Sequence, residues 1–144
     1  MTTLHFSHRA RSTAYEAVRL EKLVTAALPH CLQIARKHNA ELASLPAVEI
    51  TVLGARAMAK VHRDFLGIPG PTDVITFPYG EILVCATVAA ERAREFGHDT
   101  TTELALYAIH GLLHLSGHDD ITPAQEKRMA TAQEKILSAV LKIS

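Results

Sequence analysis

The stretch ELALYAIHGLLHLS, residues 103–116, is almost wholly apolar, and this feature limits most strongly how the chain can fold. A helix that is apolar on nearly every side has to be buried, so the other elements of the chain must surround it. Gly117 is expected to end this helix, and Thr100 with Glu103 matches a T-x-x-E capping box at its start. The sequence therefore predicts a deeply buried helix from Thr100 to the residue before Gly117.

Shorter segments of alternating or helical apolar pattern precede and follow this helix. Alternation and β-branched runs predict four strands, near residues 4–6, 48–52, 73–77 and 82–86. Helical periodicity predicts four further helices, over residues 13–38, 55–65 and 88–96 and from Thr122 onward. Pro29 is expected to kink or split the first helix, and the third and fourth strands are close enough to form an antiparallel hairpin.

This order of elements indicates a single α/β (α+β) domain spanning residues 1–144, with a mixed sheet of about four strands and about five helices. The composition agrees, since 48% hydrophobic and 21% charged residues are usual for a globular protein. No apolar run approaches the roughly 20 residues that a membrane span needs, and the N-terminus lacks a secretory signal, so we expect a cytoplasmic protein. Cys31 and Cys85 are expected to be buried free thiols.

The charge of the chain is balanced overall but unevenly placed. Residues 1–63 contain nine Lys/Arg and four Asp/Glu, a net of +5, while residues 64–144 contain six and eleven, a net of −5. The zero total argues against a general nucleic-acid binder. A protein with a basic face for a polyanion and an acidic pocket for a cation would show such a split in charge. Chance can produce the same split, because the two halves of a sequence do not correspond to two surfaces.

The segment HGLLHLSGHDD, residues 110–120, places two histidines four residues apart on the buried helix. His110 and His114 project from one face, one turn apart, and this spacing allows two imidazoles to bind one metal ion. Gly117 ends the helix and lets the chain turn back, so His118, Asp119 or Asp120 could supply a third ligand. Three protein ligands and one open position are typical of catalytic zinc.

A core helix that happens to contain histidine is the alternative interpretation. Asp119 and Asp120 would then simply precede the final helix, where its dipole stabilises negative charge, and His118 would be a solvated loop residue. Two histidines on an otherwise apolar helix need polar partners, however, and a buried imidazole is held in the neutral form that binds metals. Gly111 stands where an H-E-x-x-H peptidase has its general base, which argues against that peptidase mechanism.

HGLLHLSGHDD resembles the H-G-x-L-H-L-x-G-x-D-H signature of the YbeY family, bacterial rRNA maturation factors that act as single-strand-specific endoribonucleases. VHRDFLGIPGPTDVITFP, residues 61–78, is similar to the family's segment in which an arginine is followed shortly by P-T-D-V-L-S-F-P. Together the two segments are specific, and the resemblance covers roughly residues 45–141. It implies an α/β fold with a hydrolytic metal, usually zinc, on a helix.

The resemblance also implies particular residues and partners. The family's catalytic arginine falls on Arg63, and its first two metal ligands fall on His110 and His114. Its third metal histidine falls on Asp120, an aspartate here, so the resemblance places one Zn²⁺ or another divalent ion at these three residues, with His118 as the alternative third ligand. The implied partners are the 16S rRNA precursor and the small ribosomal subunit, together with a ribosomal protein or a GTPase.

We therefore expect a metal-dependent endoribonuclease that acts on single-stranded RNA in 16S rRNA 3′-end maturation and ribosome quality control. Arg63 would bind a phosphate oxygen, and the basic first half would line a track for RNA, with Tyr15, Phe65 and Phe77 as candidate stacking residues. Two alternatives stay open: a ribosome-associated binding factor whose metal is mainly structural, and a metallohydrolase that acts on another ester or amide.

Overall fold

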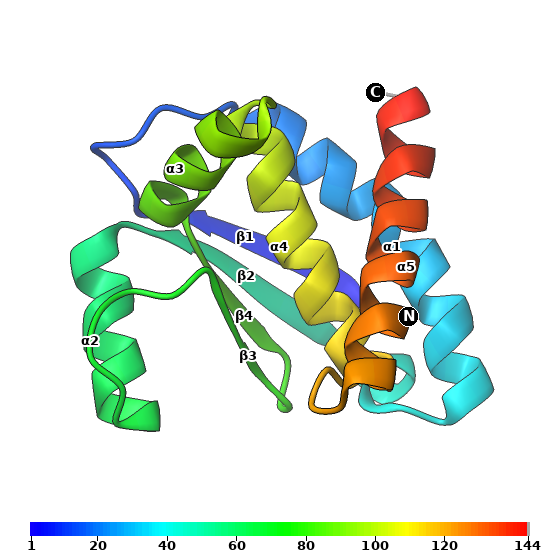
Figure 1. Cartoon of the computed structure of the whole chain (residues 1–144). Helices are drawn as coiled ribbons and strands as arrows, with labels where there is room; N and C mark the ends of the chain where they lie inside the picture. Colours follow the sequence, from blue (N-terminus) through cyan, green and yellow to red (C-terminus); the bar gives the residue numbers. More distant parts are fainter. Residues whose placement is uncertain (144) are drawn as a thin grey trace.

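Four strands form one mixed sheet in the computed structural model, which describes residues 1–143 (Figure 1). The strands are β1 (Thr3–His8), β2 (Ala47–Leu53), β3 (Val74–Phe77) and β4 (Glu81–Cys85). Their order across the sheet is β1-β2-β4-β3; β1, β2 and β4 are parallel, and β3 runs antiparallel to β4. The expected antiparallel pairing of the third and fourth strands is confirmed, as is the mixed sheet.

Residues 1–143 also form five α-helices and one short 3₁₀-helix. They are α1 (Ala17–His38), η1 (Glu41–Ser44), α2 (Ala55–Leu66), α3 (Ala86–Phe96), α4 (Thr100–Leu115) and α5 (Pro123–Lys142). The helices α1 and η1 lie between β1 and β2, α2 lies between β2 and β3, and α3, α4 and α5 follow β4. The helix α4 lies against β3 and β4 and contacts α1, α3 and α5, so that most of its side chains are buried. The prediction that this apolar helix lies at the centre of the fold is confirmed.

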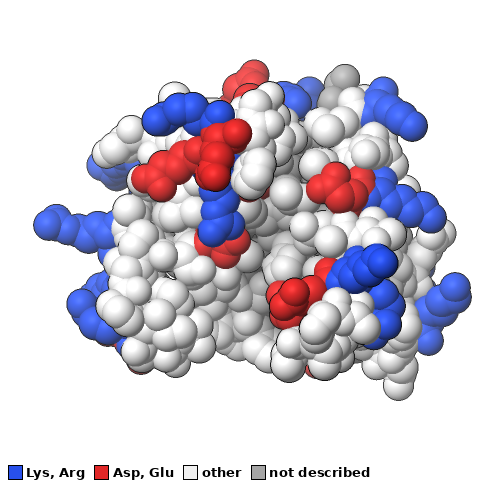
Figure 2. Space-filling model, viewed as in Figure 1, with Lys and Arg blue, Asp and Glu red and all other residues white. Residues whose placement is uncertain are grey.

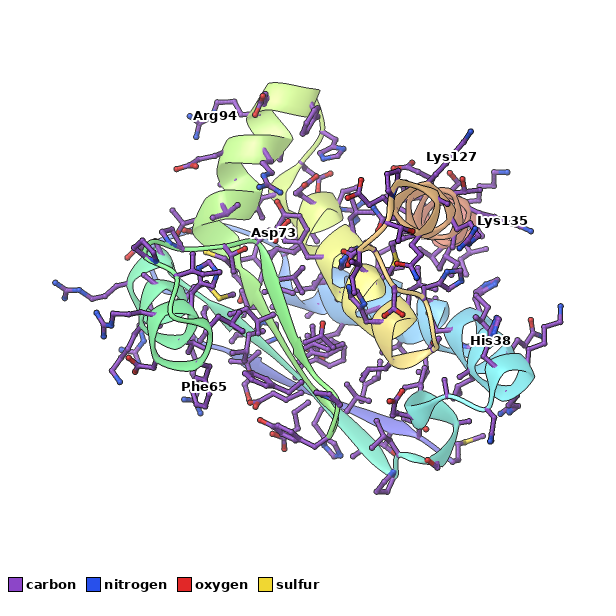
Figure 3. All side chains as sticks on the ribbon, turned by 60° about the horizontal axis from the view of Figure 1, so that its bottom comes forward. His38, Phe65, Asp73, Arg94, Lys127 and Lys135 are labelled. Carbon is purple, nitrogen blue, oxygen red and sulfur yellow. The ribbon has the colours of Figure 1, made fainter. Side chains whose placement is uncertain are left out.

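The two faces of the sheet are covered unequally. One face is covered by α1 and α4, on which α5 packs, and Ile50 and Ile82 are fully buried in this core. The opposite face is covered only in part by α2, whose Met58 packs against Ile75 and Leu83 in a second, smaller core. Figure 3 shows this asymmetry, with α2 on one side of the sheet and α4 and α5 on the other. Part of the α2 face is therefore left open.

The first helix differs from the prediction at Pro29. The helix α1 begins at Ala17 and runs without a break to His38, with Pro29 inside it. A proline removes one backbone hydrogen bond from a helix. Pro29 is exposed, so water can satisfy the carbonyl that loses its donor, while the opposite face of the helix, which includes Ala27 and Cys31, is buried. Packing of that face keeps the helix in one piece.

The start of α4 also differs from the prediction. The N-cap is Asp99 and not Thr100. The Asp99 carboxylate accepts a hydrogen bond from the Thr102 N–H at 2.7 Å. Glu103 is free of any capping role because its carboxylate bonds to Nε2 of His98 at 2.5 Å. Aspartate is at least as good an N-cap as threonine, so Thr100 is the first residue of the helix and not its cap.

Two further expectations concern the cysteines and membrane insertion. Cys31 and Cys85 are both free and buried, as predicted, and burial raises the pKa of the Cys31 thiol to about 12. Among residues 1–143, no helix combines the length and apolarity that a membrane span requires.

Candidate metal centre

Three side chains converge at the C-terminal end of α4. The Nε2 atoms of His110 and His114 lie 3.1 Å apart, and the two rings meet edge to face. Asp120, in the loop after α4, places its Oδ2 atom 3.3 Å from Nε2 of His110 and 3.5 Å from Nε2 of His114. Each of the three side chains is only partly buried. We call these residues the His-His-Asp triad.

The distances within the triad fit one small cation. Zinc binds imidazole nitrogen and carboxylate oxygen at roughly 2.0–2.1 Å in tetrahedral geometry, which sets neighbouring ligand atoms about 3.3 Å apart. The three separations in the triad, 3.1, 3.3 and 3.5 Å, lie on both sides of this value. Two imidazoles and a carboxylate are also a competent donor set for zinc, and a fourth position remains for water or substrate.

The turn after α4 brings Asp120 back to the two histidines. Gly117 adopts a φ of +103°, a conformation that favours glycine, and a Cβ at this residue would make a tight contact of 3.2 Å with Cβ of His38. The Gly117 N–H donates to the His114 carbonyl at 3.1 Å, and the His118 N–H donates to the Leu113 carbonyl at 3.0 Å. The glycine that the sequence marked as a helix stop therefore reverses the chain toward the triad.

The alternative third ligand, His118, lies elsewhere. Its ring packs edge to face on His38, with ring centroids 6.2 Å apart, and it is not part of the triad. Burial lowers the pKa of His118, and the nearby His38 and Arg128 lower it further. The geometry therefore supports Asp120 over His118 as the third ligand.

The electrostatics of the site favour neutral imidazole. Burial lowers the pKa of His114 most, and the adjacent His110 lowers it further, whereas Asp120 acts in the opposite direction. A neutral imidazole has the free lone pair that a metal ligand needs. His114 is thus held in the form that binds a cation.

Gln133 on α5 supports the triad and was not predicted from the sequence. Its Oε1 atom lies 2.9 Å from Nδ1 of His110, so Nδ1–H can donate to it and leave Nε2 free to bind metal. Its position in the sequence could have identified it, because Gln133 lies one helical turn after Met129 and one before Leu137, and both of these residues are buried. A polar residue on that buried stripe indicates a polar partner.

We expect Gln133→Leu to weaken metal binding roughly 10- to 100-fold, because His110 loses the acceptor that orients its ring. A competition titration with a chromophoric zinc chelator measures this affinity. Gln33→Leu, at an exposed position on α1, is the matched control and should bind zinc normally. Wild-type affinity in the Gln133→Leu protein would mean that Gln133 does not orient the ligand.

Arg63 lies apart from the triad. It is on the last turn of α2, its side chain is 66% exposed, and its Nε atom lies 3.3 Å from Oδ1 of Asp64. No hydrogen bond or ion pair among residues 1–143 joins it to a triad residue. Arg63 instead lines a pocket with four other cationic residues, whose lining includes none of the triad. The structure therefore does not bring the candidate catalytic arginine and the candidate metal ligands into contact.

Other residues of the segment 61–78 hold the fold near the site. Asp73 accepts hydrogen bonds from the Val74 N–H at 2.8 Å and from Nη1 of Arg92 at 2.7 Å, and so ties the start of β3 to α3. His62 lies with Nδ1 at 2.9 Å from the carbonyl oxygen of Gly70, which holds the loop before β3 against α2. These hydrogen bonds have a structural role, because none of them involves a triad residue.

The fold and the triad define a class: an α/β protein with a His-His-Asp group suited to a metal on its central helix. Comparison with known proteins agrees, because the family model described as endoribonuclease YbeY matches residues 6–141. The chain belongs to the YbeY endoribonuclease family.

Individual relatives give the same result. The endoribonuclease YbeY of Micrococcus luteus is 36% identical over 108 residues, covering 64% of this chain and 69% of the relative. The endoribonuclease YbeY of Mycobacterium bovis is 35% identical over 127 residues, covering 74% and 72%. Among solved structures, the solution structure of TM1509 from Thermotoga maritima matches with a TM-score of 0.58 and 29% identity, covering 94% of this chain and 89% of that one.

Proposed function

We propose that this protein is a metal-dependent endoribonuclease that cleaves single-stranded RNA and acts in 3′-end maturation of 16S rRNA and ribosome quality control. The observation that carries the proposal is the spacing of the His-His-Asp triad, which fits one zinc ion. The family relationship supports RNA as the substrate class. In this proposal residues 1–144 act as one domain in the cytoplasm, with the small ribosomal subunit and a ribosomal protein or GTPase as partners.

In this proposal the triad, Gln133 and Arg63 have different roles in hydrolysis. Held by His110, His114 and Asp120, a zinc ion would supply Lewis acidity, polarising a phosphodiester oxygen or lowering the pKa of a bound water to about 7. The buried helix α4 keeps the two imidazoles rigid, and Gln133 orients the first of them. Arg63, exposed and always charged, would bind a phosphate oxygen of the RNA through its planar guanidinium.

Arg63→Ala is expected to reduce kcat/KM for a single-stranded RNA roughly 10- to 100-fold, the reduction that one charge-assisted hydrogen bond accounts for. The zinc content should not change, because Arg63 does not contact the triad. Gel assays of a labelled RNA, beside elemental analysis, measure both quantities. Arg94→Ala, at an exposed position on α3, is the control and should cleave normally.

These assays, together with ribosome binding and a panel of substrates, separate the alternatives. An Arg63→Ala protein that folds, binds ribosomal subunits and shows no loss of activity would contradict the catalytic role and favour a binding factor with a structural metal. A panel of single-stranded RNA, double-stranded RNA and peptide or ester substrates tests the reaction class. Turnover of a peptide or ester with no cleavage of RNA would support a different metallohydrolase.

A further inference from the structure

A basic pocket lies where β1 and β2 end and α2 begins. Its lining includes five exposed cationic residues and no carboxylate, in a cavity of about 860 Å³; the five are Arg9, Arg11, Arg56, Lys60 and Arg63. Lys60 and Arg63 pair with Asp64, but Arg9, Arg11 and Arg56 form no ion pair with a carboxylate within residues 1–143. Figure 2 shows Lys and Arg side chains projecting at the left edge, where Figure 1 places α2.

The backbone of α2 adds to this positive field. Gly54 and Ala55 at its N-terminus line the basic pocket; Gly54 has no side chain to cap the helix, and the Ala55 N–H donates to Oγ1 of Thr87 at 3.1 Å. The amides at a helix N-terminus carry partial positive charge and attract anions. Arg9, Arg11 and Arg56, which have no carboxylate partner within residues 1–143, and this helix end leave an excess of positive charge that a chain of phosphates would neutralise.

An aromatic row lies beside the basic pocket on the open face of the sheet. It consists of Phe65, at the end of α2, with Phe77 and Tyr79 of the β3–β4 hairpin; their ring centroids are 5.6 and 5.5 Å apart. Phe65 is 69% exposed and Tyr79 is 68% exposed, which is unusual for large apolar rings in contact with one another. Figure 3 shows Phe65 on the α2 side of the sheet, away from α4.

One residue joins the two features. Arg9 lines the basic pocket and also lines a second cavity, of about 340 Å³, whose wall includes all three aromatic residues. Glu49 and Glu81 line that second cavity as well, and the Tyr79 hydroxyl donates to Glu81. These carboxylates repel phosphates, so a nucleic acid on this part of the face would present its bases and not its backbone.

We propose that the open face of the sheet is a binding platform for single-stranded RNA, separate from the metal centre. Arg9, Arg11 and Arg56 bind successive phosphates, and bases stack on Phe65 and Tyr79. This combination of a cationic groove with exposed aromatic rings is how proteins hold single strands without reading a sequence. The platform rests on the proposed function, since RNA is its ligand, and it adds a substrate anchor on the face of the sheet opposite α4.

Binding without cleavage tests the platform on its own. The Asp120→Ala protein, treated with EDTA, is titrated into a fluorescein-labelled 16-nucleotide single-stranded RNA, and anisotropy is followed across a salt series. Adding Arg11→Gln and Arg56→Gln should lower the slope of log Kd against log salt by about 1.4, or roughly 0.7 for each phosphate that the protein no longer neutralises. Adding Phe65→Ala or Tyr79→Ala should weaken binding roughly 5- to 100-fold with the slope unchanged.

Matched controls come from α3. Phe96 is 68% exposed, like Tyr79, and Arg94 is exposed on the same helix; Figure 3 shows Arg94 far from Phe65. Phe96→Ala and Arg94→Gln should leave affinity and slope as they are. The substitutions added to the Asp120→Ala protein all replace exposed side chains, and thermal unfolding verifies that each variant folds.

The outcomes separate this inference from the proposed function. If the arginine and the aromatic variants both bind RNA with the affinity and salt dependence of the Asp120→Ala protein, the platform is overturned. This holds whether or not the metal-loaded wild-type protein cleaves RNA. Equal affinity for a duplex of the same length would overturn base stacking, because paired bases are not available to the rings. Platform-dependent binding by a wild-type protein that cleaves no RNA would instead uphold the platform and overturn the endoribonuclease proposal.

Discussion

Asp120→Ala is expected to abolish stoichiometric zinc binding while the protein stays folded. The carboxylate contributes one of three donors whose spacing fits a tetrahedral ion, and alanine leaves only the two histidines of α4. We expect the affinity for zinc to fall by more than about 100-fold, since changes in the hydrogen-bonding partners of a ligand already cost up to that much. Elemental analysis of untagged protein after dialysis, with about one zinc per wild-type chain, is the measurement.

Two neighbouring residues provide controls for this experiment. Asp119→Ala removes an exposed carboxylate beside the triad and should leave the zinc content at the wild-type value. His118→Ala should do the same, because the His118 ring packs on His38 and not on the other ligands. Loss of zinc from the His118 variant but not from the Asp120 variant would contradict the assignment and make His118 the third ligand.

The third metal ligand shows which part of the site the sequence could predict and which part it could not. The spacing of His110 and His114 followed from helical periodicity, but the periodicity ended at Gly117, and beyond it three residues were equal candidates by composition. Only the resemblance favoured Asp120. The structure distinguishes them through the φ of Gly117 and the hydrogen bonds that close the helix, which turn His118 toward α1 and Asp120 toward α4. A turn of this kind depends on tertiary packing.

The sheet and the central helix were predictable for a different reason. The apolar stretch of α4 has no polar face, so exposing any side of this helix to water would cost much free energy, and the helix had to be buried. In β2, the alternation of apolar and polar residues indicated a half-buried strand. Pro29 and the N-cap of α4 were misjudged because local propensity was weighed without its surroundings. Pro29 lies on the exposed side of a well-packed helix, and Asp99 competes with Thr100 for the same capping role.

The uneven charge of the sequence could be interpreted only once the structure showed which charged residues lie together. Arg9 and Arg11 follow β1, whereas Arg56 and Lys60 belong to α2, more than forty residues later, and the parallel pairing of β1 with β2 brings the two groups to one pocket. No short stretch of the sequence contains them together. The acidic half likewise contributes Asp120 to the metal centre but also Asp73 and Glu103, whose partners are Arg92 and His98.

Gly111→Ala is expected to destabilise the protein, although alanine is the better helix former by about 1 kcal/mol. A Cβ at this position would lie 2.8 and 2.9 Å from Cγ2 and Cδ1 of Ile82 and 2.9 Å from Oγ1 of Thr76, closer than such atoms can approach. The helix α4 would have to move off β3 and β4, and overpacking of this kind costs about 1–3 kcal/mol. Less the gain in helix propensity, the net cost is up to about 2 kcal/mol, so a fall in Tm of up to roughly 8 °C is expected in thermal unfolding.

The metal centre should respond to the same substitution, because Gly111 follows His110 directly and moving this turn displaces the ligands. Ile82→Val removes Cδ1, so the double variant should be more stable than the sum of the two single changes implies. Ser138→Ala, at an exposed position on α5, controls for helix propensity and should not lower Tm. A Gly111→Ala protein as stable as the wild type would show that α4 can shift without cost. Glycine between the two histidines would then serve some purpose other than the close contact of the helix with the sheet.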